Sequence, residues 1–158
     1  MVWIQTREYR IIKVGDAMTL SKRQLAYFEE LFADYHNYQK KINLRKAELS
    51  IRELDENVGG GKSNIMGKPV ENLAIKYMTD KKLIFLQNIY ESIEKTLNSL
   101  DDDTREIVTA RYFENDGLWT WSQIAQEYHY ASSQIYRIRY RVLEMFANYV
   151  GLCNTIET

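Results

Sequence analysis

The stretch that decides the fold is TWSQIAQEYHYASSQIYRIRYRVLEMFANYVG, which runs from Thr120 to Gly151. Its apolar residues recur every three or four positions in two blocks, which predicts two amphipathic helices. In the first block, Thr120 and Gln123 form a capping-box pattern at the start, and Ala125 leaves room for a second helix to cross closely. About four residues separate the two blocks, the length expected of a helix-turn-helix.

The second block has an apolar side and a polar side. We expect the apolar stripe to face the core, and it consists of Ile135, Ile138, Val142, Phe146 and Tyr149. A helix that enters the DNA major groove needs short hydroxyls and amides near its start and arginines further along. Ser132, Ser133, Gln134 and Arg137 fit this order, and spacing puts Tyr136, Tyr140 and Arg141 on the same outer face. The predicted DNA-binding set is therefore Ser132, Ser133, Gln134, Tyr136, Arg137, Tyr140 and Arg141, with a partner-protein contact as the alternative for the two tyrosines. Three arginines, at 137, 139 and 141, against Glu144 alone give this helix a net charge of 3 − 1 = +2. The alternative is a surface helix whose arginines are merely solvated.

The same residues carry a resemblance. The stretch WSQIAQEYHYASSQIYRIRYRVLEMFA resembles the last two helices of sigma-70 region 4, and LNSLDDDTREIVTARYFENDG is similar to the first half of that region. More narrowly, the order of parts between about Glu53 and Gly151 resembles phage late-gene transcriptional regulators of the RinA and ArpU type. The resemblance implies a protein that binds a promoter or operator in double-stranded phage DNA. It would activate late genes, such as those for packaging and morphogenesis, through the host RNA polymerase in the bacterial cytoplasm.

Two positions depart from the pattern of that family. His129 stands where the family has a turn glycine, and a histidine can adopt the left-handed conformation at modest cost. Ala131 replaces the serine that usually caps the second helix. Because alanine has no side-chain acceptor, we expect Ser132 to act as the N-cap and to shift the helix start by one residue.

The amino-terminal part of the chain is also expected to be helical. No glycine or proline occurs between about Leu20 and Asn57, and apolar residues follow a three-four spacing, which predicts one long amphipathic helix or two short ones. Such a helix must bury its stripe against the rest of the chain or against another copy, so a homodimer is one of two expectations. Weak alternation in the first eighteen residues allows a short strand or hairpin.

The segment NVGGGKSN, from Asn57 to Asn64, contains the Gly-Lys-Ser of a phosphate-binding loop. The first glycine of that motif would stand at Glu56, and the residues before it favour a helix over the required strand. Four of the seven glycines and the sole proline, Pro69, lie between 59 and 69, which favours a linker. We therefore expect an amino-terminal segment at 1–58, a Gly-rich linker at 59–69, a helical DNA-binding domain at 70–151 with its helix-turn-helix at 120–149, and a tail at 152–158.

Helical spacing continues from Pro69 onward, and the acidic run Asp101–Asp103 fits the start of a helix better than a metal site. The predicted fold class is therefore all-α. A net charge of −1 neither favours nor excludes nucleic acid as a partner. No apolar run approaches the ~20 residues of a membrane span, and the start lacks the order of a signal peptide, which predicts a cytoplasmic protein without membrane contact.

Composition gives enzyme chemistry little support. Two histidines far apart and a single Cys153 offer no metal-ligand spacing and no nucleophile-base pair, so we expect no enzyme, metal or cofactor. Three alternatives to the regulator stay open. These are a phage small terminase subunit, a sigma-like polymerase subunit, and an NTPase that uses Lys62. Contact with host RNA polymerase is a further expectation, while the operator sequence, the oligomeric state and the choice between activation and repression stay undetermined.

Overall fold

The computed structural model describes residues 20–56, 68–114 and 117–151, without the side chains of 52–56 and 68–69. Within these ranges it contains seven helices and no strand, which confirms the predicted all-α class. The expected strand or hairpin in the first eighteen residues, the GGGKSN segment and the predicted tail at 152–158 lie outside the described residues.

The amino-terminal helical region consists of two helices rather than one. Helix α1 (Lys22–Ala33) begins at Ser21, whose side chain forms a reciprocal capping box with Gln24, and α2 (Tyr35–Glu56) follows directly. Asp34 separates the two helices, and its carboxylate accepts a hydrogen bond of 2.7 Å from the Asn37 amide. At Asp34 the backbone departs from helical geometry, with a ψ of 9°. Because of the break, α1 can pack on α7 while α2 packs on α4.

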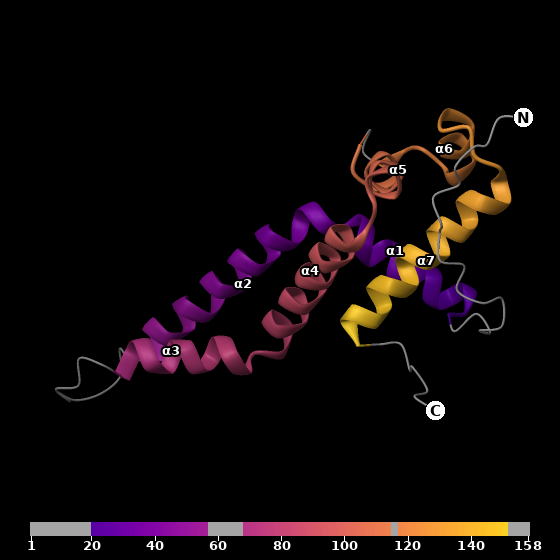
Figure 1. The fold of residues 1–158 in the computed structure, drawn as a ribbon. Coiled ribbons are helices and arrows are strands. Elements are labelled where there is room, and N and C mark those ends of the chain that lie inside the picture. Colours follow the sequence, from indigo (N-terminus) through magenta and orange to yellow (C-terminus); the bar gives the residue numbers. More distant parts are fainter. Residues whose placement is uncertain (1–19, 57–67, 115–116, 152–158) are drawn as a thin grey trace, which may run out of the picture.

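Helices α2, α3 (Lys68–Thr79) and α4 (Lys81–Ser99) form an elongated arm (Figure 1). Helices α2 and α4 lie side by side, and α3 connects their far ends. Asp80 caps α4, because its carboxylate accepts from the Leu83 amide at 2.8 Å, and it also binds the Arg45 guanidinium of α2 at 2.7 and 3.1 Å. One carboxylate thus fixes the start of α4 against α2.

Helices α5 (Asp102–Tyr112), α6 (Trp121–Glu127) and α7 (Ser132–Val150) occupy the opposite end, where α1 crosses α7 (Figure 1). Their starts confirm two predictions: Asp101 caps α5, and Thr120 with Gln123 forms a capping box on α6. Gly117 turns the chain between α5 and α6 with a φ of 68°. The bundle end is therefore built from short helices with well-defined starts.

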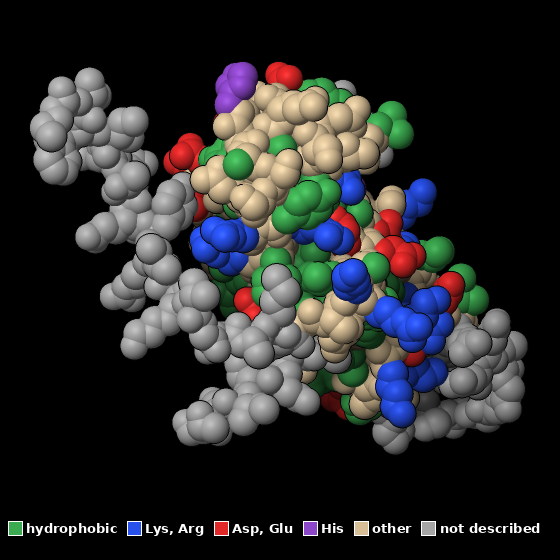
Figure 2. Space-filling model, turned by 90° about the vertical axis from the view of Figure 1, so that its right-hand side faces the viewer, with side chains coloured by type: hydrophobic (Ala, Val, Ile, Leu, Met, Phe, Trp, Pro, Cys, Tyr) green, Lys and Arg blue, Asp and Glu red, His purple; other side chains and the backbone are tan. Residues whose placement is uncertain are grey.

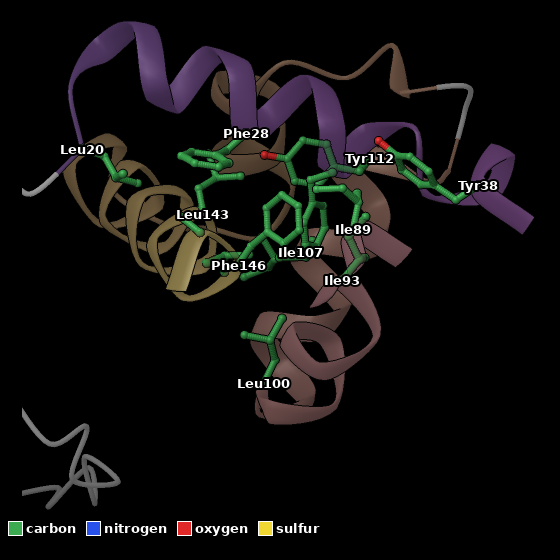
Figure 3. Packing of buried hydrophobic residues seen from close by; sticks show 14 of the residues in the cluster. Leu20, Phe28, Tyr38, Ile89, Ile93, Leu100, Ile107, Tyr112, Leu143 and Phe146 are labelled. Carbon is green, nitrogen blue, oxygen red and sulfur yellow. The ribbon is translucent and has the colours of Figure 1, made fainter. Parts of the chain in front are cut away.

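One hydrophobic core joins the arm to this end (Figure 3). Side chains from α1 (Phe28), α4 (Ile89 and Ile93), α5 (Ile107) and α7 (Phe146) point toward one another. The rings of Phe32 and Phe146, both fully buried, meet edge to face with centroids 5.4 Å apart. Burial of each such side chain contributes about 1.5–3 kcal/mol. The amino-terminal helices therefore share a core with the helices after residue 70, while most of the predicted linker lies outside the described residues.

The apolar side of α7 differs from the predicted stripe. Ile135, Val142 and Phe146 are buried and Ile138 is half-buried, as expected, but Tyr149 is 42% exposed. The Tyr149 hydroxyl bonds instead to Ser99 of α4 at 2.9 Å. The expected core position of Tyr149 is therefore wrong. Leu143 and Ala147, which the stripe did not include, are fully buried, because α7 is flanked by both α1 and α4 and buries a wider strip.

Candidate nucleic-acid interface

The candidate site is built on α6, the turn after it, and α7. Residues 128–131 form the turn, which has the four-residue length predicted from the sequence. Amides of the turn bond back to α6, from Tyr128 to Ile124 at 3.0 Å and from Tyr130 to Ala125 at 2.9 Å. His129 has a φ of 57°, which confirms the left-handed conformation expected for a residue in the glycine position. These contacts hold α7 at a fixed angle to α6.

The start of α7 corrects a prediction. Ala131, not Ser132, is the N-cap, and Ser132 is already the first helical residue. Ala131 has an extended backbone, and the side chain of Gln134 reaches back to accept its amide hydrogen at 3.2 Å. This reciprocal half of the capping box fixes the start even though alanine provides no acceptor. The expected shift of the helix start by one residue is therefore wrong.

Packing leaves most of the predicted DNA-binding residues on the surface. Six of them are exposed on one side of α7 or at its start: Ser132, Ser133, Gln134, Tyr136, Arg137 and Arg141. Among the described residues, neither Arg137 nor Arg141 forms an ion pair. Tyr140 differs, because it is half-buried and its hydroxyl accepts the Leu20 amide at 3.1 Å. We call the six exposed residues the outer face of α7.

Figure 2 looks at the end of the molecule that carries α6 and the start of α7. Its upper part, where α5 and α6 lie, shows mostly uncharged polar groups and backbone, and Lys and Arg side chains gather below it. Acidic side chains lie between some of these cations, so the surface is mixed rather than uniformly basic. The net charge of the chain, −1, does not favour nucleic acid either. Any preference for nucleic acid must therefore come from the positions of individual arginines.

Arg139 has a different role from the arginines on either side of it. Its guanidinium turns toward α1 and binds the Glu29 carboxylate, with Nε 3.2 Å from Oε1 and one terminal nitrogen 2.5 Å from Oε2. The positive charge counted for α7 in the sequence is therefore partly neutralised. Arg137 and Arg141 carry the charge of the outer face.

Glu29 connects four helices. Besides Arg139 of α7, its carboxylate accepts hydrogen bonds from the Tyr112 hydroxyl of α5 at 2.9 Å and from the Trp121 indole of α6 at 2.8 Å. The Arg111 guanidinium lies 3.8 Å away. Sequence reasoning missed Glu29, although one signal was present: it follows Leu25 by four positions and so places a carboxylate on the apolar stripe of α1. A charge on such a stripe indicates a buried partner.

The protonation state of Glu29 follows from these contacts. Burial by itself raises the pKa of the carboxyl, but hydrogen bonds from Arg139, Trp121 and Tyr112 outweigh it and leave the pKa below its ordinary value. Burial and the adjacent Glu29 charge raise the pKa of the Tyr112 hydroxyl well above its usual range. At neutral pH, Glu29 is therefore ionised and Tyr112 donates its hydrogen.

Comparison with known proteins places the chain in a family. Residues 27–148, from the middle of α1 to near the end of α7, match the family described as "Protein of unknown function (DUF722)". The chain belongs to the DUF722 family. No curated protein and no solved structure matches it. The matched residues of this DUF722 member include Glu29, all its hydrogen-bonding partners and the whole outer face of α7.

The described part of this DUF722 protein contains neither a metal-binding cluster nor a membrane-spanning helix. Over the described ranges, no group of three or more His, Cys, Asp or Glu side chains is arranged to hold a metal ion. No described helix combines the length and apolarity that crossing a bilayer requires. Family membership alone assigns no activity, so function must be argued from the geometry of the site.

Proposed function

We propose that this protein is a sequence-specific DNA-binding transcriptional regulator and that α6 and α7 act as a helix-turn-helix. One observation carries the proposal: α1 packs against α7 from the side of Arg139, so that the outer face of α7 stays exposed. A recognition helix needs this division between a buried side that fixes its orientation and a free side that enters the major groove.

The order of residues along α7 suits base recognition. Ser132, Ser133 and Gln134 occupy the first turn, where short hydroxyls and amides reach base edges. Arg137 lies one turn further along, in position for guanine or for a phosphate, and Arg141 follows after another turn, in position for the DNA backbone. A bidentate contact to a base discriminates by about 1–3 kcal/mol. Tyr136 lies on the same face, whereas Tyr140 is half-buried and its hydroxyl already accepts the Leu20 amide hydrogen, so that it can offer DNA only its own O–H as a donor.

The Glu29 contacts support the proposal in a second way. They join α1 to α5, α6 and α7, so the angle of α7 depends on a carboxylate of the amino-terminal region. Recognition requires side chains that are held within about 0.5 Å of their productive positions. Helix α1 would thus belong to the DNA-binding unit, because it orients the helix that reads the sequence.

The resemblance to sigma-70 region 4 and to phage late-gene regulators suggests the biological context. In that context the protein would activate late genes of a phage or prophage by recruiting the host RNA polymerase to a promoter, without catalysis. One helix-turn-helix reads only a few base pairs, so specificity requires a second copy or a contact with polymerase. The outer part of the arm, α3 with the end of α2 that it follows, lies away from α7 and is available for either contact.

Selection from a random library of DNA duplexes tests the proposal. Purified full-length protein should enrich a defined sequence, and the same sequence should be protected from cleavage when phage DNA is footprinted. A library that stays random after several rounds, with protein of intact helicity, would contradict sequence-specific binding.

Two further measurements separate the alternatives. Native mass measurement that finds a ring of many subunits would favour a small terminase subunit. A run-off transcript made by core polymerase together with this protein alone would favour a sigma-like subunit. A regulator would give a transcript only with the complete host enzyme.

A further inference from the structure

Helix α2 presents a row of mostly exposed side chains. Its members follow one another at alternating intervals of four and three residues, which places them on one side of a helix: Asn37, Lys41, Leu44, Glu48 and Ile51. Glu48 is half-buried and the other four are exposed. Leu44 is 61% exposed and Ile51 is 59% exposed, while Tyr38, Ile42 and Leu49 form the buried row of the same helix. Single exposed leucines are common, but two large apolar residues seven positions apart on one row form a seam.

Two hollows lie beside this row. The smaller, of about 320 Å³, is lined by Lys41, Leu44, Arg45, Glu48, Lys82 and Leu86. The larger, of about 600 Å³, lies further along α2 toward α1, and its lining includes Tyr27, Tyr38 and Phe85. Lys41 and Leu86 line both, so the two hollows form one groove along α2 and α4. Exposed apolar side chains and an apolar groove thus occur on the same surface.

We propose that a second copy of this chain docks here, with the two α2 helices packed antiparallel about a two-fold axis between Leu44 and Arg45. With this axis, a residue of one α2 helix lies level with a residue of the partner's α2 helix when the two residue numbers add up to 89. Leu44 then inserts between Lys41, Arg45 and Glu48 of the partner subunit, as a knob into a hole. The contact is isologous, so each subunit donates and accepts the same knob.

The same register brings the second apolar residue to the larger hollow. Ile51 and Tyr38 are equally far from the axis along the helix, about 10 Å at 1.5 Å per residue. Ile51 therefore lies level with the partner's Tyr38, a buried residue that lines the hollow of about 600 Å³. Each subunit would fill the hollow of the other.

Charge complementarity supports this register. Lys41 lies opposite the partner's Glu48, and the reciprocal pair forms on the other side of the axis. Within one chain, Lys41 pairs with Asp34, and Glu48 lies 2.7 Å from Arg45, so the contact would add an intersubunit pair to charges that already have partners within the chain. Rim charges of this kind fix register more than they add affinity. A shift by one turn in either direction would lose the pairing.

The inference does not rest on the proposed function, because docking uses the arm and not the outer face of α7. If both hold, the dimer carries two copies of α7. Its DNA site would then contain two half-sites related by two-fold symmetry.

Sedimentation of the full-length protein without DNA, over a range of about 1–100 µM, tests the proposal. We expect a monomer-dimer equilibrium, and Leu44→Asp should raise the dimer Kd by about tenfold or more. Lys41→Glu alone and Glu48→Lys alone should weaken the dimer, while the combined exchange should restore it because both cross-axis pairs return with reversed polarity. Lys40→Glu is the matched control, since it makes the same charge change at an exposed neighbour off the row.

A protein that stays monomeric at every concentration would overturn the proposal. So would a dimer that Leu44→Asp leaves unchanged, or single charge variants that the combined exchange does not rescue. Circular dichroism of each variant establishes that the helices are intact. Because no DNA is present, failure here is distinguishable from failure of DNA binding.

Discussion

Glu29 of α1 and Arg139 of α7 form an ion pair with two hydrogen bonds that joins the two helices, with nitrogen-oxygen distances of 3.2 and 2.5 Å. The pair joins residues that are 110 positions apart in the chain. Both side chains are partly buried. The orientation of α7 therefore depends on a residue near the start of the described chain.

Glu29→Ala should destabilise the protein by about 2–3 kcal/mol, less than the ~3–5 kcal/mol of a fully buried pair, because the Glu29 side chain is 18% exposed. The loss arises from leaving Arg139, Tyr112 and Trp121 without their acceptor. Urea unfolding measures it, and Glu30→Ala, at the exposed neighbouring position, should stay within about 0.5 kcal/mol of the parent. In a double-mutant cycle, Arg139→Ala should lower the free energy of unfolding by less in the Glu29→Ala background than in the parent protein. Additive effects would mean that the pair is not coupled.

Asp80 predicts a pH dependence of stability. Hydrogen bonds from Arg45 and from the Leu83 amide lower its pKa from 3.8 to about 2. A carboxyl whose folded pKa is depressed adds stability above its unfolded pKa and loses it as pH falls through the folded value. The melting temperature of the parent should therefore exceed that of Asp80→Asn by a constant amount above about pH 5, and the difference should shrink between about pH 4 and pH 2.

Asp102→Asn is the control for that measurement, because it removes a carboxylate that is 98% exposed from the first turn of another helix. A difference between parent and Asp80→Asn that stays constant down to pH 2 would show that the Arg45 contact does not persist in solution.

Ala131→Ser should stabilise the protein by about 0.5–1.5 kcal/mol. The backbone at Ala131 already has the extended conformation of an N-cap, and Gln134 already supplies the reciprocal bond, so a serine hydroxyl adds the missing acceptor. Thermal unfolding would show the gain. Ala33→Ser, at an exposed position at the end of α1, introduces the same side chain where no cap is needed and should give no gain. Equal melting temperatures for Ala131→Ser and the parent would contradict the assigned helix start.

Local chemistry allowed much of the fold to be predicted. The caps at Asp101 and Thr120 depend on residues three positions away, and the left-handed turn at His129 depends on one backbone position. Each is determined within a few residues, so a sequence pattern is sufficient to indicate it. The all-α class follows from apolar periodicity for the same reason.

Features that depend on long-range packing could not be predicted in this way. The sequence left open whether α1 and α2 are one helix, and it placed Tyr149 in the core and Tyr140 on the outer face. Tyr149 contacts Ser99 of α4 instead, and Tyr140 contacts Leu20, which precedes the N-cap of α1; periodicity within α7 reveals neither contact. Glu29 was missed because its partners lie 83 to 110 residues away.

The outer face of α7 was the part of the candidate site most accessible to prediction. Exposure of residues such as Ser133 and Arg137 follows from their positions opposite the apolar stripe. What these residues bind stays a prediction.

The most direct test of DNA recognition is the affinity of Arg137→Ala for the duplex that the protein selects. We expect binding to weaken by about 1–3 kcal/mol at fixed salt, with unchanged helicity and a smaller loss on mismatched DNA. Lys95→Ala, which removes one exposed positive charge from α4, is the matched control and should bind like the parent. If Arg137→Ala binds the selected duplex as tightly as the parent protein, α7 is not the helix that reads DNA.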